Sequence, residues 1–316
     1  MRDKKPVIIG LLLALVIILA CIFGIMMLNK NETPVGTADT TDFSEVELSL
    51  VSPSGAPALS LAGVIDDSSI ALDYEIVDGS EVLSAEFLDG SSDLIIAPVN
   101  LGTNLINNGA EYQLLAVVSW GNLYIVGDRS TYDRRLAAFG EGAVPGRVFE
   151  LIRSELNEEV TVDYYNSVAE VAPLLLGGEY GAALLAEPVA TRVRNSNEAL
   201  EVLYDVQDLY EDVTGDSTYP QAAIFVSSQA IKDKTEAILN LTNSIQDTII
   251  AIKNDTSLLD SYDVDYAELG FDDIALLKDA YSGMALDLVY GTDCVDEVKG
   301  FLELFDIAYD DTMYVR

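Results

Sequence analysis

The chain of 316 residues contains no histidine, and this absence excludes whole classes of chemistry. The usual catalytic triads need a histidine as base, and most zinc sites need one as a ligand. Cysteine is almost as scarce, since Cys21 and Cys294 are its two occurrences and no CxxC metal motif exists. No pair stands out among the 53 acidic side chains as an acid–base couple. We therefore expect a protein that is not an enzyme and that holds no metal and no cofactor.

Basic side chains are the second scarcity. Lysine and arginine together number 17 against 53 acidic residues, which gives a formal net charge of −36. Such a surface repels nucleic acid and anionic lipid headgroups, so we expect neither as a partner. A solvated acidic surface is the simplest interpretation of the excess.

A long apolar run occurs at the N-terminus, where Val7–Leu28 carries no charge and follows a basic flank. The run is long enough to cross a bilayer, and the flank predicts a cytoplasmic N-terminus. A lipoprotein signal is the alternative, because Ile18–Cys21 resembles a lipobox and would make Cys21 the lipidated residue. Leu19 and the apolar stretch after Cys21 favour an uncleaved anchor. Both alternatives predict a membrane partner for residues 1–30, a linker at 31–44, and a soluble part on the extracytoplasmic face of the cell membrane.

Short apolar strands alternate with helical segments over the rest of the chain, which predicts an α/β fold with mostly parallel sheets. The central stretch is residues 93–127, where strand Leu94–Ala97 stops at Pro98 and Asn100 stands at a helix start. Further strands are expected at 46–51, 70–77, 112–119, 123–126, 136–139, 160–164, 181–186, 200–205 and 222–226. Helices are expected at 56–64, 80–87, 148–156, 189–194 and 229–253, with a mostly helical remainder that includes 272–282 and 293–304.

Two pairs of prolines suggest an internal repeat. Pro57 and Pro145 are 88 positions apart, and Pro98 and Pro188 are 90 positions apart, each in a strand–loop–helix context. Two pairs at nearly one offset predict two lobes of like construction. We expect lobe I at 45–120 and 221–316, lobe II at 121–220, and crossings between them near 121–133 and 199–221.

Four short motifs stand in these loops: Ser54-Gly55-Ala56-Pro57, Asp93–Pro98, Trp120-Gly121-Asn122 and Glu141–Pro145. They resemble motifs of the substrate-binding proteins of ABC importers with the type II periplasmic-binding fold. The subgroup that includes sulfonate-, nitrate- and thiamine-precursor-binding proteins is the most similar. The resemblance implies two lobes, a hinge, a small-molecule ligand in the cleft between the lobes, and ABC transporter permease subunits as partners. It does not identify the ligand.

An anionic ligand has little support, because members of that family with anionic ligands supply basic or hydroxyl groups. The basic candidates in the middle of the chain are Arg129, Arg134, Arg135 and Arg147.

The predicted ligand-binding residues come from the loops that carry the resemblance, from the loops that match them in the repeat, and from the returning loop, where Tyr219 could cover the cleft or be structural like most of the 16 tyrosines. They are Ser52, Ser54, Gly55, Ala56, Asn100, Trp120, Asn122, Glu141, Gly142, Ala143, Glu187 and Tyr219. Structural alternatives exist for them: an ordinary turn at 52–56, a helix cap at Asn100, and core filling by Trp120. Glu141 and Glu187 could bind an amine or belong to the solvated surface.

The leading functional interpretation is a membrane-tethered, extracytoplasmic solute-binding protein. It would capture a small molecule between two lobes and deliver it to an ABC transporter permease. The alternative is a cell-surface interaction protein that uses the same fold without transport.

Overall fold

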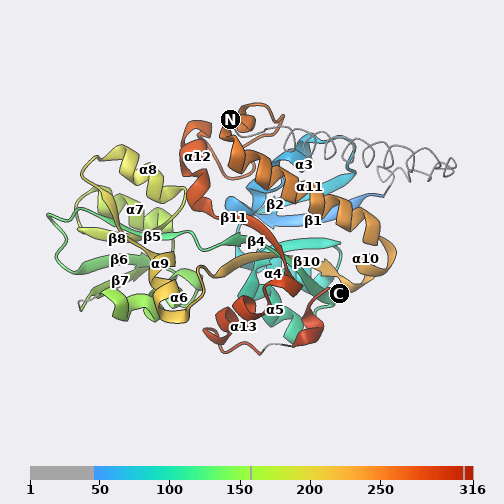
Figure 1. Cartoon of the computed structure of the whole chain (residues 1–316), viewed down its shortest axis with the longest axis horizontal. Helices are drawn as coiled ribbons and strands as arrows, with labels where there is room; N and C mark the ends of the chain where they lie inside the picture. Colours follow the sequence, from blue (N-terminus) through green and yellow to red (C-terminus); the bar gives the residue numbers. More distant parts are fainter. Residues whose placement is uncertain (1–45, 157–158, 309, 316) are drawn as a thin grey trace, which may run out of the picture. The chain divides into compact units, whose positions relative to one another are not determined.

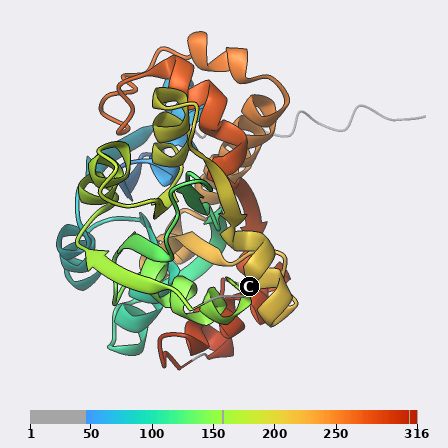
Figure 2. The same ribbon diagram turned by 90° about the vertical axis from the view of Figure 1, so that its left-hand side faces the viewer.

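The strands of the chain form two separate sheets (Figure 1). The computed structural model describes residues 46–156, 159–308 and 310–315. In the six-stranded sheet the order is β11 (Leu286–Tyr290), β4 (Tyr112–Trp120), β10 (Pro220–Ser227), β3 (Leu94–Pro98), β1 (Leu48–Pro53) and β2 (Leu72–Val77). In the five-stranded sheet it is β7 (Thr161–Tyr165), β6 (Arg135–Phe139), β8 (Ala182–Ala186), β5 (Leu123–Gly127) and β9 (Glu201–Asp205). Figure 2 turns the side of the molecule that carries the five-stranded sheet toward the reader.

The sheets are mixed, so the expectation of mostly parallel sheets is wrong. β1 pairs in parallel with β2 and β3, and β6 pairs in parallel with β7 and β8. The pairs made by β5, β10 and β11 are antiparallel. β5 and β10 are the first strands after the chain passes from one sheet to the other. They therefore run opposite to the neighbours between which they insert.

Helices connect the strands and cover the sheets. They are α2 (Ala56–Leu59), α3 (Ala62–Asp66), α4 (Ser80–Asp89), α5 (Val99–Asn107), α6 (Val144–Ile152), α7 (Val168–Leu176), α8 (Val189–Ser196), α9 (Val206–Thr214), α10 (Ser228–Asp233), α11 (Thr235–Asn254), α12 (Ile274–Ala280) and α13 (Val295–Glu303), with short 3₁₀ turns after several of them. α11 is amphipathic, since its buried residues recur every three or four positions at Ile238, Leu241, Ile245, Ile249 and Ile252.

Four expectations about these elements are corrected. The helix expected at 229–253 is divided into α10 and α11, because Lys234 leaves helical geometry with φ −129°. The helix expected at 56–64 is divided into α2 and α3. Strand β11 lies in a region expected to be mostly helical, and α9 was not foreseen.

The chain passes between the sheets at two places. Gly121 and Asn122 are the whole of the first crossing, between β4 and β5, and residues 215–219 form the return crossing between α9 and β10. The Gln207 side chain joins the two: its Nε2 donates to the carbonyl of Leu123 at 3.0 Å, and its Oε1 accepts from the Leu123 N–H at 3.1 Å. The same Oε1 accepts from the Tyr219 hydroxyl at 3.3 Å. One amide therefore fixes the start of β5 and the end of the return crossing.

The largest hydrophobic cluster is continuous across both sheets. It includes Val117 and Phe225 of the six-stranded sheet, Ile125 of the five-stranded sheet, and Tyr219 between them. The Tyr219 ring is stacked on Phe301 with centroids 6.0 Å apart and contacts Tyr210 at 5.1 Å. Two further clusters are confined to one sheet each.

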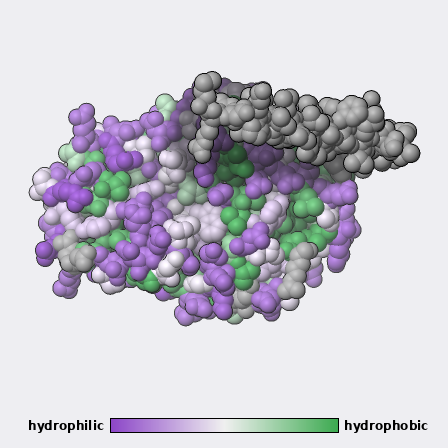
Figure 3. All heavy atoms as spheres, viewed as in Figure 1, coloured by the Kyte–Doolittle hydropathy of each residue, from purple (hydrophilic) through white to green (hydrophobic). Residues whose placement is uncertain are grey.

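The described surface in Figure 3 is mostly hydrophilic, with hydrophobic residues in small separate groups. None of the helices in the described ranges is both long enough and apolar enough to span a bilayer. The expected anchor at 1–30, the linker at 31–44 and Cys21 lie outside those ranges.

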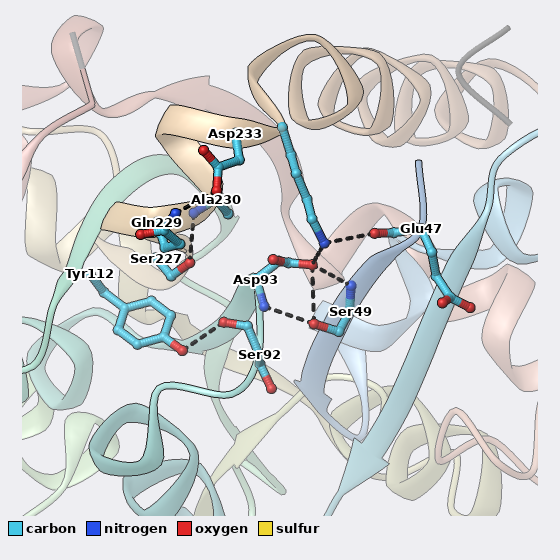
Figure 4. Close-up of polar contacts among 10 residues, drawn as sticks. Glu47, Ser49, Ser92, Asp93, Tyr112, Ser227, Gln229, Ala230 and Asp233 are labelled. Atoms are coloured by element: carbon cyan, nitrogen blue, oxygen red, sulfur yellow. Dashed lines mark hydrogen bonds and ion pairs between the residues drawn. The ribbon is translucent and has the colours of Figure 1, made fainter. Parts of the chain in front are cut away.

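Asp93 ties the start of β3 to β1 and to the α10–α11 junction (Figure 4). Its Oδ2 accepts hydrogen bonds from the N–H of Ser49 at 2.9 Å and from the Ser49 hydroxyl at 3.2 Å. The ammonium of Lys234 lies 2.8 Å from the same oxygen and also donates to the carbonyl of Glu47 at 2.8 Å. Lys234 is also the residue at which the expected helix is divided into α10 and α11.

Replacing Asp93 by asparagine should lower the free energy of unfolding by about 1.5–3 kcal/mol, because the charge-assisted bonds to Lys234 and Ser49 are weakened. Urea unfolding followed by circular dichroism measures the loss. Asp73→Asn on β2 is the matched control, since this side chain is exposed. An Asp93→Asn protein as stable as the control would contradict the structural role of the contact.

Gly121→Ala should destabilise the protein by about 1–3 kcal/mol through overpacking. A Cβ at this position would lie 2.7 Å from the Tyr219 ring, which is fully buried and cannot retreat. Gly142→Ala is the control, because a Cβ there meets no atom within 4 Å. Thermal unfolding of both variants should show a lower melting temperature than the wild type for Gly121→Ala alone.

Candidate functional site

Four loops, two from each sheet, line one pocket of about 560 Å³, here called the four-loop pocket. The loops are Pro53–Pro57 after β1, Pro98–Leu101 after β3, Gly142–Pro145 after β6, and Glu187–Pro188 after β8. The remaining lining residues are Ser80, Ser119, Asn122, Gln221 and Ala222. The pocket therefore lies at the carboxyl ends of four strands, where open α/β sheets generally bind ligands.

Each of the four loops leads into a helix. Pro57 and Pro145 are the second residues of α2 and α6, and Pro98 and Pro188 are the N-cap residues of α5 and α8. The prolines that are 88 and 90 positions apart thus occupy matching places. The first turns of α5 and α6 receive no side-chain cap, so they bring backbone N–H groups to the pocket. In α6 the contribution is that of Val144, because Pro145 has no N–H and the N–H of Gly146 donates to the carbonyl of Gly140 at 3.0 Å.

Asn122 of the first crossing is the most unusual polar residue in the lining. Its side chain is 5% exposed, and its Oδ1 is buried without a hydrogen-bond partner among the described residues. Asn100 shares this feature, since its Oδ1 is also buried and unpaired. A buried acceptor without a partner is destabilising by about 1–3 kcal/mol, which makes both atoms candidates for contact with a ligand.

The sequence predicts that Asn100 stands at the start of its helix, and this prediction is wrong. α5 begins at Val99 with Pro98 as its cap, and Asn100 is its second residue. The Pro98 ring already presets the backbone for the helix start, so the amide of Asn100 is not used as a cap.

Glu187 is the one ionisable side chain among the described residues that line the pocket. It is 8% exposed, and its two oxygens accept from the hydroxyl and the N–H of Thr191 at 2.8 and 3.0 Å, so it caps α8. The guanidinium of Arg194 lies 3.8 Å from Oε1. Burial raises the pKa of Glu187, and the Thr191 bonds and Arg194 oppose that shift.

The loop after β1 reaches the pocket with its polar groups partly engaged. The Ser54 hydroxyl donates to Asp78 at 2.7 Å, and the N–H of Gly55 donates to the carbonyl of Leu269 at 2.8 Å. Gly55 has φ +93°, a conformation that favours glycine. Ala56 completes this corner, and Gly142 and Ala143 form the corresponding corner after β6.

Four predicted residues are not brought to the pocket. Ser52 is fully buried, and its hydroxyl donates to the carbonyl of Pro53. Tyr219 is also fully buried in the aromatic stack with Phe301, so it does not cover the pocket. Glu141 is exposed and lies outside the lining, while Trp120 donates its ring N–H to the carbonyl of Asp287 and lines a different cavity.

That second cavity, of about 950 Å³, is larger but chemically different. It lies beside both crossings, and here it is called the acidic cavity. Its charged lining residues are Asp205, Glu211, Asp216, Asp287, Asp293 and Glu297, with Lys253 and Lys278. Helix N-termini and unpaired amide oxygens lie at the four-loop pocket instead, and we take that pocket as the candidate site.

Ser80, Ser119 and Gln221 line the pocket and were not foreseen. Ser119 and Gln221 belong to β4 and β10, which pair in the six-stranded sheet. Only the pairing of two distant strands brings them together, whereas the loop residues carry a local signal of glycine and proline.

No protein-family model and no curated protein sequence matches the chain. Solved structures do match. An ABC transporter protein from Parabacteroides distasonis has a TM-score of 0.73 and 19% identity, over 85% of this chain and 99% of that one. The periplasmic aliphatic sulphonate binding protein SsuA from Escherichia coli has a TM-score of 0.64 and 11% identity, over 82% of this chain and 86% of that one. The ligand binding component of an ABC-type import system from Staphylococcus aureus has a TM-score of 0.60 and 12% identity, over 85% of this chain and 96% of that one.

The chain has the fold of periplasmic binding proteins. The resemblance to ABC-importer binding proteins is thereby confirmed at the level of the fold. At these identities the likeness does not extend to the ligand.

The raised pKa of Glu187 predicts a specific pH dependence. Because its folded-state pKa is above the ordinary 4.5, the folded chain holds this proton more firmly than the unfolded chain. Its contribution to stability is therefore greatest below the ordinary pKa and is lost as the pH rises through the folded-state pKa. The free energy of unfolding of the wild type minus that of the Glu187→Gln variant should therefore decrease between about pH 4 and about pH 7.

Urea unfolding at a series of pH values measures this difference. Glu141→Gln controls for the removal of one carboxylate from a neighbouring loop at an exposed position. A difference between wild type and Glu187→Gln that rises with pH would show that burial does not dominate at this carboxylate.

Proposed function

We propose that this chain is a solute-binding protein that captures a small molecule in the four-loop pocket and passes it to the permease of an ABC importer. The observation that carries the proposal is the meeting of four helix-initiating loops, two from each sheet, around one pocket with two unpaired buried amide oxygens. A volume of about 560 Å³ lies within the range of small-molecule sites. The likeness to binding proteins of ABC importers supports the same function.

The proposed mechanism is closure of two lobes on the ligand. Lobe I comprises 45–120 and 221–316, and lobe II comprises 121–220. Since the first crossing is only two residues long, rotation about it would change the distance between the paired loops. A ligand that contacts both lobes would stabilise the closed state by as much as its differential affinity for that state.

The proposal includes a location. A membrane anchor or lipid at Cys21, followed by the linker at 31–44, would keep the domain on the extracytoplasmic face beside its permease. The apolar run in the sequence at 7–28 supports this part of the proposal.

Binding should raise the melting temperature of the full-length chain in detergent. At a ligand concentration about one hundred times Kd the stabilisation is about 2.7 kcal/mol, or roughly 5–10 °C. A screen of a defined metabolite library by thermal shift tests for it. Hydrogen exchange should then slow in all four loops, because ligand and closure protect both sheets' corners together.

Asn100→Leu should keep the ligand-free melting temperature and reduce the ligand-induced shift, since it removes an unpaired pocket acceptor without removing an existing bond. Asn240→Leu on the exposed face of α11 is the control. Failure of the whole library to shift the wild type, or protection limited to the loops of one sheet, would refute capture between lobes.

A further inference from the structure

The charges at the four-loop pocket are unusual for a site related by fold to a sulphonate-binding protein. Among its described lining residues there is no lysine and no arginine, and the single charged side chain is the carboxylate of Glu187. An anion would therefore meet a like charge and no cationic side chain. The formal net charge of −36 adds a long-range field that attracts cations and repels anions.

The unpaired polar atoms of the pocket lining also favour a ligand with hydrogen-bond donors over an anion. The Oδ1 atoms of Asn122 and Asn100 are hydrogen-bond acceptors, buried and without partners among the described residues. The carboxylate of Glu187 uses one acceptor position on each oxygen for Thr191 and has further lone pairs free. Three side chains thus offer acceptors, which a donor-rich ligand can satisfy.

Glu187 and Asn122 are also linked through the backbone. The N–H of Glu187 donates to the carbonyl of Asn122 at 3.1 Å, so both residues are held at the same edge of the lining. Arg194 is not among the lining residues and lies 3.8 Å from the carboxylate, beyond the 2.7–2.9 Å of a charge-assisted hydrogen bond. The Arg194 guanidinium instead donates to the Thr191 hydroxyl at 2.9 Å, so its ion pair with the carboxylate is a long one.

We propose that the four-loop pocket takes a small organic molecule with a protonated amino group, and that Glu187 and Asn122 receive that group. The inference rests on the proposed function and adds the chemical class of the ligand. The uncapped first turn of α5 and the N–H of Val144 in α6 would meet an acceptor on the same molecule, such as a carbonyl or carboxylate, because these N–H groups are donors. A simple amine and an amino acid would both place an amino group at Glu187 and Asn122. Only the amino acid would also place a carboxylate at the two helix starts.

The test begins with the full-length chain in detergent and three sets of defined probes. The first holds amines and amino acids, including putrescine, agmatine, lysine and 4-aminobutyrate. The second holds amine-free anions, including ethanesulfonate, butanesulfonate, nitrate and butyrate, and the third holds neutral sugars and alcohols. Thermal shift ranks the probes, and isothermal titration calorimetry measures Kd for the best of each set.

The expected result is that the strongest binders belong to the first set. Tighter binding of amino acids than of simple amines would place the ligand's acceptor at α5 and α6. Equal affinities would mean that the pocket recognises the amino group alone. Either result supports the proposal. Strongest binding by sulfonates or other amine-free anions would overturn it while leaving the proposed function intact. No binding by any set would overturn both.

Two variants then test the assigned residues with the best amine probe. Glu187→Gln should weaken binding roughly tenfold or more, since a charge-assisted hydrogen bond is lost. Glu141→Gln, an equal charge change at an exposed residue outside the lining, should alter Kd by less than about twofold because exposed charges are screened by solvent and salt. If both variants weakened amine binding equally, the effect of Glu187 would be one of long-range charge, and its assignment to the amine site would be overturned.

Glu187→Gln also removes part of the α8 cap, so a second variant guards against misfolding. Asn122→Leu removes the unpaired acceptor, keeps the branching of the side chain's heavy atoms, and should leave the ligand-free melting temperature unchanged or higher. It should nevertheless weaken amine binding roughly tenfold. Unchanged affinity in a folded Asn122→Leu protein would exclude Asn122 from the amine site.

Discussion

The hydrogen bonds of one amide, Gln207, organise this structure. The first crossing has only Gly121 and Asn122 with which to pass from one sheet to the other, so the direction of β5 depends on how its first residue is held. Gln207 binds both backbone groups of Leu123 and also the Tyr219 hydroxyl of the return crossing. With that direction set, β8 pairs with β5, and the loop after β8 arrives beside Asn122.

The candidate site follows from this arrangement. Strands end and helices begin at the same edge of each sheet, so the backbone supplies N–H groups there without special side chains. The polar side chains that remain, Asn100, Asn122 and Glu187, then determine what the pocket can recognise. In most folded proteins buried acceptors are paired, and the two unpaired ones in this lining are therefore the atoms at which a ligand or a water could be bound.

Local features of the sequence were sufficient to locate much of the pocket. Prolines and glycines after short apolar strands mark loop corners wherever they occur, which is why Gly55, Gly142 and Glu187 could be chosen without coordinates. Residues placed by distant contacts could not be chosen in this way. Tyr219 lies in a polar loop by local pattern but is buried by Phe301, more than eighty positions later in the chain.

The same limit explains the errors in the secondary structure. β11 is a strand because it pairs with β4 at the edge of the six-stranded sheet, and its own short sequence does not reveal that partner. Lys234 interrupts a helical pattern, and its ammonium is bound by Asp93, which is remote in sequence. Asn100 resembled a helix cap by residue type, yet the preceding Pro98 had already taken that place.

The continuous hydrophobic cluster beneath the crossings has a consequence for folding. Proteins with two separately packed halves can melt in steps, since each half keeps its own interior when the other is lost. Here Tyr219 and its aromatic neighbours belong to the interior of both sheets at once. Losing either half would expose apolar surface on the other, which couples the two into one cooperative unfolding unit.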